Sequence, residues 1–178
     1  MKNLLVFIGE SGSGKTTLIT ELSGRYPEQF KKVVTCTSRP ARAGEIDAVD
    51  YHFLPEEYFI CNPNLVLTKR TADGFYYGTR KLDLFHATRN LLLTSRPTGV
   101  SKLVSLGCRN IVVVRISIGE KLKIRRMRQR GDTDKIISDR LLSDTRNQTV
   151  VDFGKIPVVD LHAEQKIEDK IKLVLQTC

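Results

Sequence analysis

The sequence predicts an α/β fold with a mostly parallel core sheet flanked by helices. Short apolar runs alternate with segments of helical periodicity along most of the 178 residues, which favours parallel strands joined by helical crossovers. The first run, Leu4–Ile8, is unbroken and ends at Gly9, which is typical of a strand buried on both faces. The length indicates a single domain over residues 1–178, since domains commonly hold roughly 100–200 residues.

The other predicted strands are short apolar or β-branched runs. They are Val33–Val34, Tyr51–Leu54, Leu65–Lys69, Phe75–Tyr77, Leu91–Thr94, Ile111–Ile118 and Ile156–Leu161. The predicted helices place apolar residues at helical spacing or begin at a Pro, which is tolerated in a first helical turn. They are Thr16–Arg25, a short helix from Pro55, Lys81–Thr88, Val100–Leu106, Lys121–Arg130, Ile136–Thr149 and Ile167–Leu175.

The alternation breaks between about Thr35 and Tyr77. Thr35–Asp50 is rich in Arg, Gly, Pro and acidic residues and has no periodicity, which predicts a loop. Farther on, Asp73-Gly74 is a turn signal between two strand-like runs and predicts that they pair. We therefore expect an inserted, partly antiparallel subdomain in this stretch.

Composition narrows the class of protein. The chain has 29 Lys and Arg against 20 Asp and Glu, a net charge of +9, which favours an anionic partner or serves solubility alone. No apolar run approaches the ~18 residues of a membrane span, so no membrane partner is expected. The four scattered cysteines are expected to be reduced thiols in a cytoplasmic protein. Three His and no Cys cluster argue against structural zinc.

One motif is matched without a mismatch. Gly9-Glu10-Ser11-Gly12-Ser13-Gly14-Lys15-Thr16 fits G-x-x-x-x-G-K-[ST] between a predicted strand and a predicted helix. The glycines let backbone N–H groups face phosphate oxygens, and the helix N-terminus adds its dipole. Lys15 can neutralise the β- and γ-phosphates, and the Thr16 hydroxyl can ligate Mg²⁺. We expect a nucleoside triphosphate and Mg²⁺ here, with the nucleotide contacted by Gly9, Ser11, Gly12, Ser13, Gly14, Lys15, Thr16 and Thr17.

A second group of residues suits another anion. Arg39 and Arg42 lie three apart on a Pro-stiffened loop and can converge on one phosphate, with the hydroxyls of Thr35 and Thr37 nearby. The segment Gly74–Thr79 supplies phenol and hydroxyl donors. A solvated loop for the arginines, and strand packing for the two tyrosines in that segment, are alternatives that the sequence leaves open.

A third segment concentrates positive charge. Lys121–Arg146 holds nine Lys and Arg against four Asp. Cations that close over a transferring phosphoryl group stabilise its charge, and a hinge glycine such as Gly131 beside Arg130 suits such a lid. For any single Arg here, the alternative is a solvated helix face.

Together these segments resemble the guanylate kinase family. The quoted motifs are the phosphate loop, Ser38-Arg39-x-x-Arg42-x-Gly44-Glu45 followed by Asp50-Tyr51-x-Phe53, and Tyr76-Tyr77-Gly78-Thr79, in that family's order. The resemblance implies a P-loop NTPase-type core (residues 1–34, 79–120 and 150–178), an inserted nucleotide-monophosphate-binding subdomain (35–78) and a helical lid (121–149).

The resemblance also implies roles for individual residues. The acceptor phosphate would be held by residues that match Arg39, Arg42, Tyr51 and Tyr77. The acceptor's base and sugar would be approached by Thr35, Glu45 and Thr79. Arg126, Arg130 and Arg140 match lid positions that clamp the phosphates, and Lys15, Arg130 and Arg140 would carry catalysis.

Two segments depart from the family's pattern. Thr68, followed by Lys69 and Arg70, stands where the family usually carries a Glu that accepts hydrogen bonds from guanine. Thr94-Ser95-Arg96 replaces a D-x-D pair. A donor facing a donor leaves buried polar groups unpaired, at about 1–3 kcal/mol each. Lys69, Arg70 and Arg96 are cations at these two places. They would favour an acceptor that carries an additional anionic group, and Arg96 is expected to contact the substrate.

The predicted function is ATP- and Mg²⁺-dependent transfer of the γ-phosphoryl group to a small phosphorylated acceptor, with GMP or dGMP as the leading candidates. Ribose 1,5-bisphosphate or another nucleotide is an alternative acceptor. A non-catalytic binding domain of the same shape is a second alternative, supported by the missing D-x-D pair. Nucleic-acid binding is a third and is less favoured, because no aromatic-rich basic stretch is present. The oligomeric state is not predicted.

Overall fold

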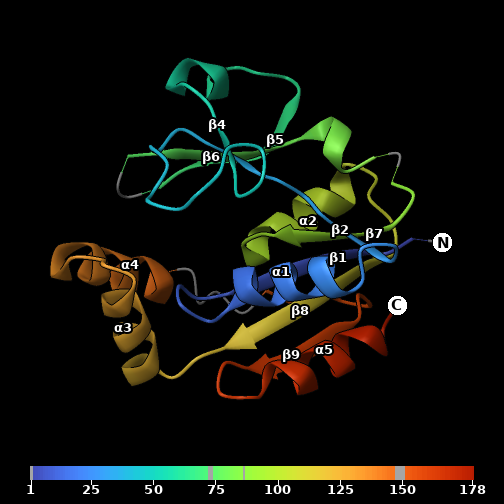
Figure 1. Cartoon of the computed structure of the whole chain (residues 1–178). Helices are drawn as coiled ribbons and strands as arrows, with labels where there is room; N and C mark the ends of the chain where they lie inside the picture. The colour runs from blue at the N-terminus through green and yellow to red at the C-terminus, as the bar shows by residue number, and fades with distance from the viewer. Residues whose placement is uncertain (1, 72–73, 86, 147–150) are drawn as a thin grey trace. The chain divides into compact units, whose positions relative to one another are not determined.

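The computed structural model describes residues 2–71, 74–85, 87–146 and 151–178. The chain divides into two compact units (Figure 1). The core unit comprises Met1–Lys32 and Arg89–Cys178, and the inserted unit comprises Val33–Thr88.

The core unit is built on a five-stranded sheet in the order β2-β7-β1-β8-β9. Its strands are β1 (Leu4–Gly9), β2 (Phe30–Lys32), β7 (Asn90–Thr94), β8 (Ile111–Ser117) and β9 (Val158–His162). Every pairing in this sheet is parallel, and β1 lies between β7 and β8. This sheet confirms the predicted α/β class with a parallel core.

Helices complete the core unit (Figure 1). They are α1 (Lys15–Arg25), α2 (Pro97–Ser105), α3 (Glu120–Gln129), α4 (Asp134–Arg146) and α5 (Ile167–Leu175). Alternate β1 residues such as Leu5 and Phe7 share one apolar cluster with Leu18 of α1 and Val174 of α5. The intervening residues of β1 are also buried, so both faces of the sheet are covered, as its unbroken apolar strands require.

The inserted unit holds a four-stranded sheet in the order β4-β3-β6-β5. Its elements are β3 (Cys36–Thr37), β4 (His52–Phe53), the 3₁₀ turn η1 (Glu56–Phe59), β5 (Leu65–Arg70) and β6 (Tyr76–Arg80). β6 runs antiparallel to both β3 and β5. Cys36 of β3, Leu65 of β5 and Phe59 of η1 form a small apolar cluster. The predicted 65–69 and 75–77 strand pair is confirmed, whereas Asp73 of its predicted turn lies outside the described residues.

Several predicted elements are wrong. The stretch Thr35–Asp50, expected to be a loop, contains β3, and the short helix expected from Pro55 is the 3₁₀ turn η1. The strand expected at Val33–Val34 lies instead at Phe30–Lys32, where Phe30 pairs with Asn90 of β7. The helix expected at Lys81–Thr88 is only a 3₁₀ turn, η2 (Lys81–Asp83). Leu84 is buried, but Leu82 and Phe85 stay exposed, so these two apolar side chains add no burial that would stabilise further helical turns.

The predicted subdomain, residues 35–78, falls inside the inserted unit. Its expected C-terminal end lies within β6, which continues to Arg80. Across the described residues, no helix has the length and apolar content to cross a membrane.

Adjacent residues of α2 offer a test of which face of that helix is buried. Leu103 is completely buried, whereas Val104 is half exposed. We expect Leu103→Ala to lower the free energy of unfolding by about 2–5 kcal/mol, because it leaves a cavity. Val104→Ala should change it by less than about 0.5 kcal/mol. Urea unfolding of both variants measures the difference, and equal losses would contradict the assigned burial.

Candidate functional site: a phosphate loop with paired cations

The loop between β1 and α1 depends on glycine at three positions. Gly9, Gly12 and Gly14 have φ values of 146°, 77° and 97°, which residues with a Cβ rarely adopt. A Cβ on Gly9 would lie 2.3 Å from the carbonyl oxygen of Ile116 on β8. Gly14 is the N-cap of α1 and has no side chain to cap the first helical turn. The N–H groups of that turn therefore suit an anion.

Lys15 folds back onto this loop. Its Nζ donates to the carbonyl oxygens of Gly9 and Glu10, both at 2.8 Å, and lies 3.4 Å from Ser13 Oγ. Burial is the main cause that lowers the pKa of Lys15 to about 8; the charge of Arg130 acts in the same direction, and the charges of Asp144 and Glu10 oppose it. An anionic ligand would raise this pKa again by stabilising the ammonium form.

Helix α3 packs against the back of the loop through Arg126. Its Nη1 donates to the carbonyl oxygen of Gly12 at 2.9 Å, and its Nη2 donates to that of Ala163 at 3.2 Å. Lys170 Nζ donates to the same Ala163 oxygen at 3.2 Å. Arg126, which the resemblance matches to a phosphate clamp, is thus bonded to the backbone of the loop and of the segment after β9.

Lys123, one turn before Arg126, is an unpredicted member of the site. Its Nζ lies 2.7 Å from Glu10 Oε2 and 2.9 Å from Asp144 Oδ2. Burial alone would lower the pKa of Lys123, but hydrogen bonds to these carboxylates outweigh it and the pKa is raised. The motif treats Glu10 as a variable position. One sequence signal could have indicated Lys123. It lies three residues before Arg126, so both side chains are on one face of the predicted helix.

Arg130 and Arg140 meet at one carboxylate. Arg130 follows α3 and donates to Asp132 through Nε at 2.6 Å and also through Nη2. Arg140 Nη1 from α4 lies 3.6 Å from the same Asp132 oxygen. Asp132 is almost completely buried between them, with 5% of its side chain exposed. The two predicted lid arginines are therefore brought together around an acidic residue that the sequence did not single out.

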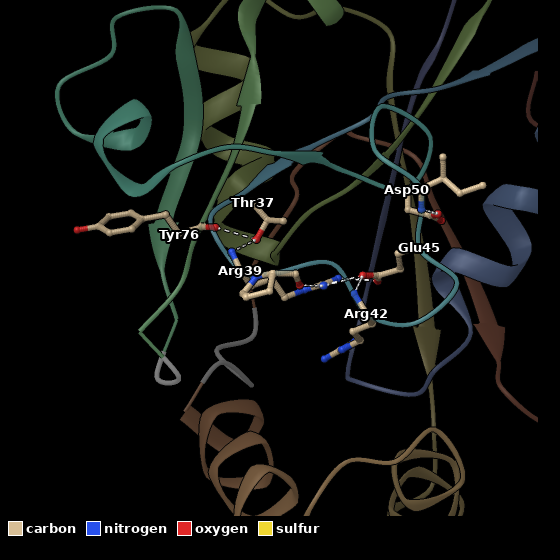
Figure 2. Close-up of polar contacts among 8 residues, drawn as sticks. Thr37, Arg39, Arg42, Glu45, Asp50 and Tyr76 are labelled. Atoms are coloured by element: carbon tan, nitrogen blue, oxygen red, sulfur yellow. Dashed lines mark hydrogen bonds and ion pairs between the residues drawn. The ribbon is translucent and has the colours of Figure 1, made fainter.

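In the inserted unit, Arg39 is buried and makes a bidentate ion pair with Glu45 (Figure 2). Both Nη–Oε distances are 2.6 Å, and Nη1 also donates to the carbonyl oxygen of Pro40 at 2.8 Å. The hydrogen bond from Arg39 lowers the pKa of Glu45. Glu45 also accepts the backbone N–H of Arg42 at 2.8 Å, while the Arg42 side chain is exposed.

Aromatic rings surround this ion pair. The Arg39 guanidinium carbon lies 4.9 Å from the ring centroid of Tyr51, and Tyr51 packs edge-on against Tyr77 with 6.0 Å between centroids. Burial raises the pKa of Tyr51. Arg39, Glu45, Tyr51 and Tyr77 are thus gathered in one cluster, as the predicted acceptor site requires.

Thr37 fixes the loop that carries Arg39. Its Oγ1 donates to the Tyr76 carbonyl oxygen at 3.0 Å and accepts the Arg39 N–H at 3.3 Å (Figure 2). The Thr35 carbonyl oxygen accepts the His52 N–H at 2.9 Å. Thr79 is buried on β6 opposite Val66. Thr37, which the sequence offered only as a neighbouring hydroxyl, therefore positions Arg39.

The positions that depart from the family's pattern lie in both units. Lys69 pairs with Tyr77 across β5 and β6, and its Nζ lies 5.6 Å from the Tyr77 ring centroid. Arg70 stands likewise over Tyr76 at 5.6 Å. Thr68 lies beside Gly78 of β6. A Cβ on Gly78 would be only 3.3 Å from Thr68 Oγ1. Arg96 precedes α2 in the core unit.

Thr16 and Thr17 lie exposed in the first turn of α1. Over the part of the chain that the structure describes, no three His, Cys, Asp or Glu side chains gather as a metal-binding group. A Mg²⁺ ion commonly takes one or two protein ligands together with substrate phosphates and water. The Thr16 hydroxyl fits that mode.

The chain is similar to known proteins in both sequence and fold. The sequence model of the family described as guanylate kinase matches residues 1–166. The guanylate kinase of Lawsonia intracellularis is 34% identical over 149 residues, 80% of this chain and 69% of that protein. The guanylate kinase of Mycoplasmoides gallisepticum is 26% identical over 180 residues, 97% of this chain and 92% of that protein.

Among solved structures, the guanylate kinase from Anaplasma phagocytophilum matches with a TM-score of 0.65 and 18% identity, over 98% of this chain and 83% of that one. A gluconokinase from Sinorhizobium meliloti 1021 matches with a TM-score of 0.55 and 15% identity, over 99% of this chain and 91% of that one. At these identities the two structures support the fold alone.

Two glycines of the core unit give a matched test of the loop. We expect Gly9→Ala to abolish binding of inorganic triphosphate, because its Cβ would clash with β8 at a φ that alanine avoids. Gly24 lies in α1 with open space around its Cβ position. Gly24→Ala should raise the free energy of unfolding by about 0.5–1 kcal/mol and leave binding intact. Calorimetric titration and urea unfolding measure both, and a Gly9→Ala variant that binds normally would refute the loop geometry.

Proposed function

The chain belongs to the guanylate kinase family, and on that premise we propose that it transfers the γ-phosphoryl group of ATP to a small phosphorylated acceptor, with GMP or dGMP the first candidates. The observation that carries this proposal is the intact phosphate loop, in which Lys15 and three left-handed glycines form an anion site at the start of α1. A domain kept only for protein contacts would have no need of that geometry.

The core unit would bind ATP. The N–H groups at the start of α1 would contact phosphate oxygens, and Lys15 would exchange the carbonyl oxygens of Gly9 and Glu10 for the β- and γ-phosphates. Arg130 and Arg140, paired at Asp132, would stabilise the charge of the transferring group. Mg²⁺ supplies additional charge neutralisation when it is bound, with the Thr16 hydroxyl as its protein ligand.

The inserted unit would bind the acceptor. Arg39, with Arg42, Tyr51 and Tyr77, would hold the acceptor phosphate, and Thr35, Glu45 and Thr79 would approach its base and sugar. An oxygen of that phosphate attacks the γ-phosphorus while the bond to the β-phosphate oxygen breaks, so ADP leaves and the acceptor gains one phosphoryl group. The transfer requires no protein nucleophile, because its catalysis is positioning and charge stabilisation.

A second candidate acceptor has its own supporting observation. Lys69 and Arg70 stand over the rings of Tyr77 and Tyr76, and both are hydrogen-bond donors without acceptor capacity. Guanine presents N–H donors, whereas a sugar bisphosphate presents a second anion. Ribose 1,5-bisphosphate or another nucleotide is therefore the alternative to GMP and dGMP.

A coupled assay of ADP release over GMP, dGMP, AMP, CMP, UMP and ribose 1,5-bisphosphate tests the proposal. We expect one acceptor, with GMP and dGMP counted together because they carry the same base, to exceed the others by at least about 100-fold in kcat/KM, because polar pairing discriminates strongly. If ATP binds tightly and no acceptor is phosphorylated, the chain is a binding domain and the proposed reaction is refuted.

Three variants distinguish residues that stabilise the transferring phosphoryl group from residues that bind the acceptor. Lys15→Ala should lower kcat/KM by at least about 10³-fold, because it removes charge stabilisation of the transferring group. Arg39→Lys should raise the acceptor KM about tenfold with little change in kcat, since it loses the bidentate fork. Arg128→Ala, an exposed arginine paired with Asp134, is the control and should behave as the wild type. An Arg39→Lys variant with an unchanged acceptor KM would remove Arg39 from the acceptor site.

A further inference from the structure

The second residue of the phosphate loop is acidic. Glu10 lies between Gly9 and Ser11, and its backbone oxygen accepts a hydrogen bond from Lys15 at 2.8 Å. Its carboxylate is therefore part of a loop whose amides are suited to phosphate. A like charge in such a place weakens anion binding unless it is neutralised.

Lys123 provides that neutralisation. Only 5% of its side chain is exposed, and its Nζ lies 2.7 Å from Glu10 and 2.9 Å from Asp144 on α4. The three groups together carry a net charge of −1. The charges of Asp144 and Glu10 both act on Lys15, so the cluster lies within electrostatic reach of the loop's own cation.

The position of Lys123 is fixed by the contact between α3 and the loop. A Cβ on Gly12 would lie 3.5 Å from the Lys123 carbonyl oxygen and 3.6 Å from Arg126 Cβ. Arg126 also donates to the Gly12 carbonyl oxygen at 2.9 Å. These contacts hold the backbone of α3 against the loop and do not involve the Lys123 side chain. The ammonium group joins the loop to α4, the helix that carries Arg140.

We propose that Lys123 is a positioning residue that sets the affinity of the phosphate loop for polyphosphate anions by neutralising Glu10 and Asp144. This inference rests on the proposed function only in taking a polyphosphate as the ligand. On this proposal, the negative charge of Glu10 weakens anion binding and the positive charge of Lys123 offsets that effect. The buried Lys123 amine also connects the loop to α4 through its ion pairs with Glu10 and Asp144.

The proposal fixes the sign of each charge change. Removing Lys123 takes one positive charge away from two carboxylates near the ligand and must weaken binding. Removing either carboxylate while Lys123 remains makes the cluster more positive and must strengthen binding. A purely structural role for the network predicts instead that every one of these substitutions weakens binding, because each breaks the same ion pairs.

Calorimetric titration of the full chain with inorganic triphosphate, without metal, at pH 7 and two salt concentrations tests these signs. We expect Lys123→Met to weaken binding about tenfold and Glu10→Gln and Asp144→Asn each to strengthen it about threefold, with smaller effects at high salt. The triple variant should recover to within about threefold of the wild type. Lys121→Met, an exposed neighbour on α3, should change binding less than the buried lysine does.

Weaker binding by Glu10→Gln and Asp144→Asn, or unchanged binding by Lys123→Met, would overturn the proposal. If Lys123→Met fails to fold, the two carboxylate variants decide by the direction of their effect, since both retain the buried lysine. Triphosphate binding by the wild type distinguishes failure of this inference from failure of the proposed function. If the wild type does not bind triphosphate, the proposed function is refuted as well. If it binds but the variants change affinity in the opposite directions, only the role of Lys123 is refuted.

Discussion

The structure of the core unit depends on one constraint: a short loop must turn its backbone amides toward concentrated negative charge. The loop meets this constraint with glycines at φ values that other residues avoid, packed so closely on β8 that a Cβ at Gly9 would lie 2.3 Å from a carbonyl oxygen. The buried strand β1 holds one end of the loop and α1 holds the other. Helix α3 then supports it from behind through Arg126 and Lys123.

Four cations of the candidate site are bound to protein acceptors in this structure. Lys15 is held by loop carbonyl oxygens, Lys123 by Glu10, Arg130 by Asp132 and Arg39 by Glu45. Such pairing fixes long side chains in one geometry, which lowers the entropy that a ligand must remove when it binds. It also means that the net charge of +9 overstates the positive charge available at any one place. A ligand phosphate must compete with a carbonyl oxygen or a carboxylate for each of these cations.

Local sequence signals predicted much of this arrangement. The phosphate loop, the parallel strands and the gathering of Arg39 with Tyr51 and Tyr77 all follow from patterns within a few residues of one another or from motifs in a known order. Lys123 and Asp144 escaped prediction because their roles depend on tertiary contacts such as that between Lys123 and Glu10, 113 positions apart. Asp132 lies only two positions from Arg130, but nothing in the local sequence singled it out among the acidic residues of that segment. The predicted Lys81–Thr88 helix was wrong because two of its apolar residues, Leu82 and Phe85, remain exposed and cannot stabilise further helical turns.

Lys15 lies at the centre of the proposed anion site, and a polyphosphate ligand should raise its lowered pKa by stabilising the ammonium form. A nitrogen NMR titration of the Lys15 amine in the free protein and in its triphosphate complex tests this directly, with the resonance assigned by its loss in Lys15→Ala. The free amine should titrate at a pKa of about 8, and the complex should titrate above about 10, so that binding takes up a proton between these values. Affinity should accordingly fall as pH rises above 8. A free amine that titrates near the ordinary value of 10.5, unchanged by triphosphate, would contradict the account.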